Sequence, residues 1–84
     1  MTISKTENFL SHFAKFPNGI KKIYAKQEAI FEANWLDPRL HAKKIKELKG
    51  VFSFRITWRY RVLFYFRDRG AVFFSVGHRK DIYD

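Results

Sequence analysis

Apolar residues in the first third of the chain recur at helical spacing, after Ile3, which would begin a short edge strand. Ser4 stands three residues before Glu7, the spacing of a capping box, and a helix is predicted over residues 5–16. The sequence Pro17-Asn18-Gly19 ends this helix, because proline cannot continue the hydrogen-bond ladder and Asn-Gly favours a turn. Its predicted buried stripe consists of Phe9, Leu10, Phe13 and Phe16.

A second segment, which ends near Trp35 and before Asp37-Pro38, has the clearest amphipathic pattern. Its apolar positions follow the i, i+3, i+4, i+7 rule, and lysines and glutamates fall elsewhere on the helix. The predicted buried positions are Ile20, Ile23, Tyr24, Gln27, Ile30, Phe31 and Asn34. Together the two helices predict an antiparallel hairpin with one apolar face.

The period of the pattern then changes from 3.6 to 2, which is typical of strands. Apolar and polar residues alternate over residues 52–58, 60–66 and 72–76. Turns are predicted near Arg59 and at residues 68–70, so the three strands would form an antiparallel meander. The predicted fold is therefore α+β, with an N-terminal two-helix hairpin packed on a small antiparallel β-sheet.

Burial of one face sets the predicted strand register, because a slip of one residue would expose all of its apolar side chains. The apolar positions of every strand are buried by three pairs, Phe54–Phe64, Ile56–Val62 and Phe64–Phe74. The helices would cover this face. The opposite face would be open to solvent and would carry Ser53, Arg55, Thr57, Arg61, Leu63, Tyr65, Phe73 and Ser75.

Basic residues are predicted to converge at one edge of that open face. In this register Arg61 lies diagonal to Arg55 and beside Gly77. The chain that leaves the last strand then brings His78 and Arg79 next to both arginines. We therefore predict one solvent-facing pocket that holds guanidinium groups and an imidazole.

The charge and composition of the chain limit the kinds of ligand that such a pocket could bind. The 84 residues, expected to form a single domain over 1–84, include 17 Lys and Arg against 8 Asp and Glu, a net charge of +9. This charge favours polyanions and speeds their encounter, with solubility alone as the alternative interpretation. The sequence has no cysteine, which excludes disulfides and thiolate zinc sites and favours a cytoplasmic location. No apolar run approaches about 20 residues, so no membrane span is predicted.

The residue types in the predicted pocket suit a phosphodiester, and cleavage of RNA in particular. Such cleavage needs a base for the ribose 2′-hydroxyl, a positive site for the phosphorane and an acid for the departing 5′ oxygen. Arg55, Arg61 and Arg79 would fill the electrostatic role, because the guanidinium fork matches two phosphate oxygens. His78 is the first choice for proton transfer, and Tyr83 would donate a proton or stack on a base.

A basic run precedes the strands and has two interpretations, a solvated face or a rim that contacts phosphates. Its members are His41, Lys43, Lys44, Lys46 and Lys49, preceded by Arg39. His41 would join in proton transfer only if its loop folds over the sheet. The sequence shows no paired carboxylates, zinc-binding spacing, Gly-rich phosphate loop or serine elbow, so neither a metal nor another cofactor is predicted.

The stretches LKGVFSFRI (48–56), YRVLF (60–64) and GHRKDIY (77–83) resemble the RelE/ParE superfamily of bacterial toxins. The resemblance implies a microbial-ribonuclease-like α+β fold and a toxin of a type II toxin–antitoxin pair. RelE-like members cut mRNA in the ribosomal A site without a metal. The implied partners are mRNA on the ribosome and a cognate acidic antitoxin, which would cover the cationic face in a hetero-oligomer.

The resemblance also implies roles for individual residues. Arg55 matches a basic residue of the strand, Arg61 the arginine of the Tyr-Arg pair, and Arg79 the basic residue after the last strand. Tyr83 matches a terminal tyrosine, and His78 resembles a terminal histidine that some relatives use as base or acid.

The sequence departs from RelE at two places. Ser53 stands where RelE has a lysine, and the sequence ends one residue after Tyr83, so no C-terminal helix is expected. ParE-like relatives keep the fold but poison DNA gyrase. Three functions therefore stay open: an mRNA endoribonuclease, a gyrase inhibitor, and a non-catalytic protein that binds an antitoxin. Arg55, Arg61 and His78 favour the first. For the proton-transfer base, His78, Tyr83 and His41 all remain candidates.

Overall fold

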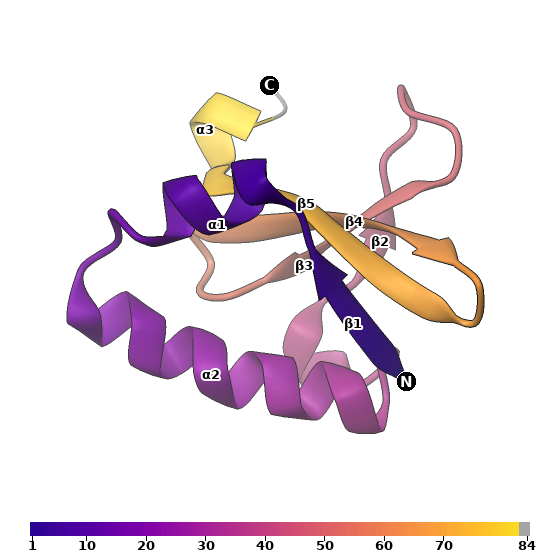
Figure 1. Cartoon of the computed structure of the whole chain (residues 1–84), viewed down its shortest axis with the longest axis horizontal. Helices are drawn as coiled ribbons and strands as arrows, with labels where there is room; N and C mark the ends of the chain where they lie inside the picture. Colours follow the sequence, from indigo (N-terminus) through magenta and orange to yellow (C-terminus); the bar gives the residue numbers. More distant parts are fainter. Residues whose placement is uncertain (83–84) are drawn as a thin grey trace.

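The computed structural model describes residues 1–82 and confirms the predicted α+β class. Five strands form one sheet in the order β1-β5-β4-β3-β2, in which β1 is parallel to β5 and the other neighbours are antiparallel (Figure 1). The elements in chain order are β1 (Thr2–Lys5), α1 (Glu7–Phe13), α2 (Asn18–Ala33), η1 (Pro38–Leu40), β2 (Lys43–Lys44), β3 (Val51–Arg55), β4 (Tyr60–Arg67), β5 (Gly70–His78) and α3 (Arg79–Ile82).

The first helix is shorter than predicted and has a different cap. Thr6, not Ser4, is its N-cap, and the Thr6 hydroxyl accepts a hydrogen bond from the backbone N–H of Phe9 at 3.2 Å. Ser4 instead lies in β1, opposite Val72 of β5. The residues before Thr6 that the capping-box spacing assigns to the helix thus belong to β1 and pair with β5 instead. The expected edge strand at the N-terminus is confirmed.

The two N-terminal helices run in opposite directions in Figure 1 and meet through an aromatic side chain. The ring of Tyr24 lies 5.8 Å from that of Phe9 and 4.7 Å from that of Phe13, centroid to centroid. Two residues of the predicted apolar stripes point away from this contact. Leu10 is 50% exposed and Ile23 is 41% exposed, so their predicted burial is wrong.

An aromatic cluster between α2 and the sheet forms the core. Phe31 of α2 is fully buried, and its ring centroid lies 5.1 Å from Phe54, 4.9 Å from Phe64 and 5.0 Å from Phe73. Two of these contacts are edge-to-face, an arrangement that contributes about 0.5–1.5 kcal/mol per pair beyond the burial of area. This cluster fixes α2 across one face of the three central strands.

A single polar side chain links this helix to the strand that carries Arg55. The Gln27 amide is buried, and its Nε2 donates to the backbone carbonyl oxygens of Arg39 at 3.2 Å and Arg55 at 2.9 Å. Both hydrogen bonds are partly buried, and a buried polar group left without a partner is costly. Gln27 therefore sets the position of the end of β3 relative to α2.

The register between β3 and β4 differs by two residues from the prediction. Phe54 pairs with Val62 and Arg55 with Arg61. The connecting loop is short, because the N–H of Ile56 donates to the carbonyl of Tyr60 at 2.9 Å. The predicted pairing assumed a longer loop. A shift of two residues leaves every side chain on its predicted face.

The register between β4 and β5 changes along the strands. Val62 pairs with Val76 as predicted, but a shift between Leu63 and Phe64 pairs Phe64 with Phe73 instead of Phe74. Phe73 is therefore fully buried in the core, and its predicted place on the open face is wrong. The extra residue of such a bulge reverses the face of every position beyond it.

The turn at residues 68–70 is confirmed and has two residues in the left-handed region, Asp68 at φ 50° and Arg69 at φ 65°. Such a turn matches the twist of a two-stranded hairpin. Gly70 follows, and a Cβ there would lie 2.6 Å from the carbonyl oxygen of Thr2. The glycine therefore allows β1 to approach β5. None of the helices in residues 1–82 has the length and apolar character to cross a bilayer.

Candidate functional site

Two arginines stand directly opposite each other on neighbouring central strands. Arg55 of β3 pairs with Arg61 of β4, which in turn pairs with Gly77 of β5. Their neighbours Phe54 and Val62 are fully buried in the core under α2. Because side chains alternate along a strand, both arginines lie on the other face of the sheet. The Cβ atoms of directly paired residues lie only about 4.5–5.5 Å apart, and like charges on such residues destabilise a sheet.

This face is more covered than predicted. The exposed fractions are 6% for Arg61, 3% for Leu63 and 0% for Ser53, so the prediction of an open, solvent-facing surface is wrong at these positions. Part of the cover is α3, whose existence contradicts the expectation that no C-terminal helix forms. A Cβ on Gly77 would lie 2.9 Å from Cγ2 of Ile82, which places α3 against the strand beside Arg61.

Arg55 is half-buried, and its Nε atom is buried without a hydrogen-bond partner among residues 1–82. A buried guanidinium N–H is costly to leave unsatisfied. An anion with oxygens in one plane would satisfy such a group, since the guanidinium fork presents parallel donors. The geometry at this position therefore favours a phosphate or carboxylate ligand.

The basic run lies next to the arginine pair but divides between the two faces. Lys43 pairs with Ser53, so it shares the face of Arg55, whereas Lys44 pairs with Phe52 and points to the opposite side. Beyond them, Ile45 is buried, and Lys46 and Lys49 are exposed in the loop that connects β2 to β3. In Figure 1 this loop and α3 lie on one side of the sheet and α2 lies on the other.

Two members of the N-terminal part of that run have other roles. His41 is exposed in the left-handed conformation, φ 49°, and caps η1. Arg39 donates from Nε at 3.0 Å and Nη2 at 2.9 Å to the Asp37 carboxylate. These hydrogen bonds lower the pKa of Asp37 to about 2 and raise the pKa of Arg39. Arg39 is thus already paired with a carboxylate.

His78 does not share the face of the arginine pair, and the predicted single pocket is wrong on this point. It pairs with Tyr60, and the two rings lie 5.6 Å apart. Tyr60 also contacts Phe16, at 5.0 Å between ring centroids. His78 and Tyr60 therefore face the helices, where they line a cavity of about 540 Å³. The residue after Gly77 necessarily points to the opposite side from Arg61, because the strand is still extended there.

The hydrogen bond of the His78 ring gives it a structural role. Its Nδ1 accepts from the backbone N–H of Lys80 at 3.1 Å, so in the neutral ring the proton sits on Nε2. The acceptor nitrogen of the neutral ring is thus already engaged by the backbone. His78 caps the first turn of α3.

Arg79 lies at the same end of the sheet but is stacked on an aromatic ring. Its Cζ is 4.6 Å from the ring centroid of Trp58, and its backbone N–H donates to the carbonyl of Arg59 at 2.8 Å. Sequence reasoning did not single out Trp58. Tyr83, the remaining predicted catalytic residue, lies outside the described residues.

Known structures share this architecture over nearly the whole chain. The RelB–RelE antitoxin–toxin complex from Methanococcus jannaschii matches with a TM-score of 0.74 and 28% identity, covering 96% of this chain and 95% of that one. The YoeB dimer from Staphylococcus aureus matches with a TM-score of 0.74 and 18% identity, covering 94% and 97%. The DinJ–YafQ complex from E. coli matches with a TM-score of 0.67 and 13% identity, covering 99% and 98%. The chain has the RelE-like fold of the RelE/ParE superfamily. No protein-family model and no curated protein matches the sequence.

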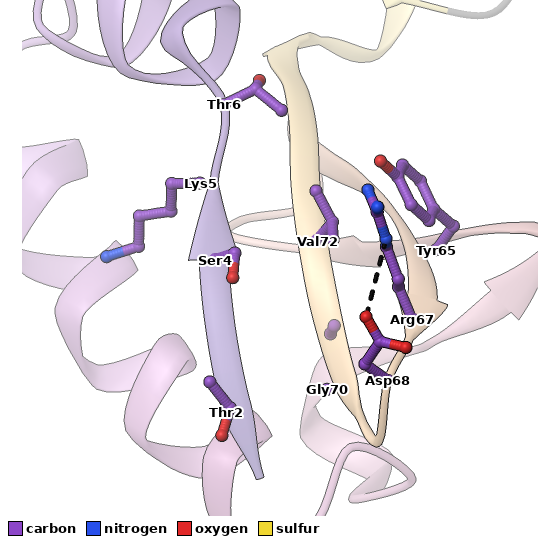
Figure 2. Close-up of a pocket in the computed structure, with 10 residues that line it drawn as sticks. Thr2, Ser4, Lys5, Thr6, Tyr65, Arg67, Asp68, Gly70 and Val72 are labelled. Atoms are coloured by element: carbon purple, nitrogen blue, oxygen red, sulfur yellow. Dashed lines mark ion pairs between the residues drawn. The ribbon is translucent and has the colours of Figure 1, made fainter.

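A second concave region of this RelE-like fold lies on the arginine face, at the far end of β4. Figure 2 shows a pocket of about 460 Å³ between β1, β5 and β4. Arg67 lines it and forms an exposed ion pair with Asp68 at 3.7 Å. Its other lining residues include the hydroxyl side chains of Thr2, Ser4, Thr6 and Tyr65, whereas the Lys5 side chain points away from it, toward Glu28 of α2. Exposed ion pairs contribute little to stability.

The titratable residues of the described chain do not suggest a metal centre. No group of three His, Asp or Glu side chains in residues 1–82 is placed to hold an ion. The pKa of the Tyr24 phenol is raised well above its ordinary value, first by burial and then by its hydrogen bond to the Glu28 carboxylate. Tyr24 belongs to the core beneath α1 and not to the arginine face.

Proposed function

We propose that this protein is the toxin of a type II toxin–antitoxin pair and that it inhibits translation by cutting mRNA on the ribosome. The RelE-like fold supports the first part, together with the 28% identity to the archaeal RelB–RelE complex over nearly the whole chain. The observation that carries the second part is the pairing of Arg55 with Arg61 on adjacent strands. The two guanidinium groups present forked donors side by side, an arrangement that suits the oxygens of a phosphodiester.

The proposed reaction is transfer of a phosphodiester within RNA. The 2′-hydroxyl loses its proton and attacks the phosphorus, the bond to the 5′ oxygen breaks, and that oxygen leaves with a proton as a 5′-hydroxyl. The other product is a 2′,3′-cyclic phosphate. Negative charge accumulates on the phosphorane oxygens in between, and Arg55 and Arg61 would bind those oxygens. Loss of one such donor typically lowers the rate about 10²- to 10³-fold.

Proton transfer is assigned to Tyr83 rather than His78 in this proposal. The His78 ring faces the helices and its Nδ1 is bound to the N–H of Lys80, which weighs against its action as a base at Arg61. Of the two other candidates from the sequence, His41 is exposed at the end of η1, so Tyr83 is chosen. Arg79, at the end of β5, would contact the phosphate next to the scissile one. The expectation for Tyr83→Phe is loss of cleavage, whereas His78→Ala retains it when α3 stays folded.

The exposed lysines beside the pair would contact the RNA backbone. Lys43, Lys46 and Lys49 are exposed, and Lys43 shares the arginine face. The sequence also assigns His41 and Lys44 to this phosphate-binding rim, but Lys44 points to the opposite side of the sheet. Phosphate contacts release counterions, so affinity for RNA should fall steeply as salt rises. The same cationic face would receive the acidic segment of a cognate antitoxin, which would block access of RNA to the arginines.

Induced expression tests the proposal. Wild type should arrest growth and leave cut messages, and Arg61→Ala should do neither. Lys22→Ala removes the same charge from the exposed surface of α2 and should behave as wild type. Because Arg61 is buried, the folded state of the variant is checked by circular dichroism, and Arg55→Ala provides a second variant at a half-buried position.

The outcomes separate the parts of the proposal. Growth arrest with intact messages would contradict mRNA cleavage and leave a toxin with another target. Inhibition of DNA supercoiling by the purified protein, insensitive to Arg61→Ala, would identify that target as gyrase. Normal growth at high expression without an antitoxin would contradict toxicity itself.

A further inference from the structure

Trp58 is presented to solvent at the tip of the loop between β3 and β4. More than half of this residue, 56%, is exposed. A scattered apolar residue at the surface is unremarkable by itself. Trp58 differs from such a residue in its surroundings. Its loop is closed by hydrogen bonds, two guanidinium groups lie against its ring, and the Arg55–Arg61 pair lies close by.

The loop that holds the ring is closed by four hydrogen bonds. The N–H of Ile56 donates to the carbonyl of Tyr60 at 2.9 Å, and the N–H of Arg79 donates to the carbonyl of Arg59 at 2.8 Å. The Thr57 hydroxyl oxygen lies within hydrogen-bonding distance of two backbone N–H groups, those of Arg59 at 3.1 Å and Tyr60 at 3.3 Å. The ring is therefore placed in advance, and little conformational entropy is lost when a ligand stacks on it.

Two guanidinium groups lie against the ring. The distance from Cζ to the ring centroid is 5.3 Å for Arg59 and 4.6 Å for Arg79, within the range of a cation–π contact. Both arginines are exposed, and within residues 1–82 neither forms an ion pair with an acidic side chain. The surface around the ring is therefore positively charged, with its donors available to an anion.

The ring also lies next to the arginine pair. Ile56 directly follows Arg55 and Tyr60 directly precedes Arg61, and the hydrogen bond between Ile56 and Tyr60 closes the loop around Trp58. Trp58 follows Arg55 by three residues, so at about 3.3 Å per residue the chain between them spans at most roughly 10 Å. This distance suits one nucleotide between a phosphate at the arginine pair and a base at the ring.

We propose that Trp58 is a stacking platform for a base of single-stranded RNA beside the phosphate held by Arg55 and Arg61. Arg59 and Arg79 bind the adjoining phosphates. The proposal rests on the RNA-cleaving function proposed above and adds a binding subsite to it. An aromatic ring flanked by cations recognises a nucleotide through its π-face and its phosphate at once, and it accepts any base. An acidic protein segment would need the arginines but not the exposed ring.

Fluorescence tests the subsite directly, because the chain has two tryptophans in different environments. The Trp35 ring packs against Phe52, Phe64 and Phe66 and can be replaced in a Trp35→Phe background. The probe is a short oligoribonucleotide with 2′-O-methyl groups, which bind but cannot be cut. Stacking should quench the emission of Trp58 on titration. The same oligomer without bases should bind through its phosphates, as seen by anisotropy, without quenching.

Substitutions then separate stacking from charge. Trp58→Ala should weaken binding of the 2′-O-methyl oligomer roughly five- to a hundredfold, the range for loss of a stacked base, with an unchanged salt dependence. Trp58→Phe should retain most of the affinity. Arg59→Gln should weaken binding and lower the slope of log K against log salt by about one.

Failure of this subsite is distinguishable from failure of the proposed function. If wild type cuts mRNA and Trp58→Ala binds the oligomer as tightly as wild type, only the subsite is overturned. If wild type neither binds nor cuts RNA, the function is overturned as well. If Trp58→Ala weakens binding of an antitoxin and leaves RNA affinity unchanged, the ring serves a protein partner and the stacking proposal is wrong.

Discussion

The two faces of the sheet differ in what they bury. The face under α2 buries phenylalanine rings, and its one buried polar side chain among residues 1–82, Gln27, donates two hydrogen bonds. The other face buries Arg61 and Ser53 beside Leu63, and it sets two guanidinium groups opposite each other. The first arrangement lowers the free energy of the folded state. The second places like charges on directly paired residues, a combination that is unfavourable in a sheet.

The contrast shows how a domain of 84 residues can support a charged site. A chain of this size has only a small net stability, so an unfavourable site must be offset elsewhere in the fold. The buried phenylalanine rings on the helix side of the sheet supply that offset, namely Phe9, Phe31, Phe54, Phe64 and Phe73. Residues on the helix face should therefore control stability, and residues on the arginine face should control activity.

Truncation of the central core ring should have the largest effect on stability. Phe31→Ala removes a fully buried ring that contacts Phe54, Phe64 and Phe73. The expected loss is about 3–5 kcal/mol in the free energy of unfolding, measured by urea denaturation. Leu10→Ala is the matched control on α1, because Leu10 is half exposed, and it should change stability by less than about 0.5 kcal/mol. Equal losses at the two positions would contradict the core described here.

Removal of one arginine should lower activity without lowering stability, the opposite of the effect of Phe31→Ala. Arg55→Leu takes away a charge that faces Arg61, so the unfolding free energy should stay constant or rise. Cleavage of mRNA should fall about 10²- to 10³-fold. Arg67→Leu removes the same charge from an exposed position at the far end of β4, and its cleavage should stay near wild type. A marked loss of stability in Arg55→Leu would show that the guanidinium has a structural role instead.

Gln27 connects the two faces, and its substitution should affect both. Gln27→Leu keeps the helix packed but leaves the carbonyls of Arg39 and Arg55 without their donor. We expect a loss of about 1–3 kcal/mol in stability and a smaller loss of cleavage, because the end of β3 is no longer fixed. Lys26→Ala, on the exposed surface of the same helix, is the control and should change neither quantity. Loss of stability with normal cleavage in Gln27→Leu would contradict this prediction and show that Gln27 does not influence the arginine face.

The sequence predicts the class of fold and the helix face well, because the hydrophobic pattern changes its period from 3.6 to 2 whatever the register of the strands is. It could not predict the bulge after Leu63, since Val72, Phe73 and Phe74 are all apolar and fit either face. The two-residue offset between β3 and β4 depends on hydrogen bonds of the Thr57 hydroxyl and the backbone within the loop. Periodicity carries no information about those bonds.

The candidate site was predicted less completely than the fold. Arg55 and Arg61 were expected to be diagonal, and they are directly opposite, which strengthens the case for an anion between them. His78 was placed with them because it follows Gly77 in sequence, although alternation along the strand sends it to the helix face. Trp58 was treated as one member of an alternating strand. Its position at a loop tip between Arg59 and Arg79 arises only from the fold.

The smallest predicted effect lies outside both faces, in the segment between α2 and β2. The pKa of Asp37 is lowered from the ordinary 3.8 to about 2, chiefly by hydrogen bonds from the Arg39 side chain. A carboxylate with a lowered pKa in the folded state stabilises the protein above its unfolded pKa, and this contribution is lost as the pH falls through the folded pKa. Asp37→Asn should therefore lower the thermal midpoint slightly at neutral pH, and the difference from wild type should vanish between about pH 4 and pH 2. Because the carboxylate and the guanidinium are at the surface, added salt should reduce the difference at neutral pH as well. No difference between Asp37→Asn and wild type at neutral pH would show that Asp37 acts through its hydrogen bond to the N–H of Arg39 at 2.9 Å, which an asparagine side-chain oxygen can also accept, and not through its charge.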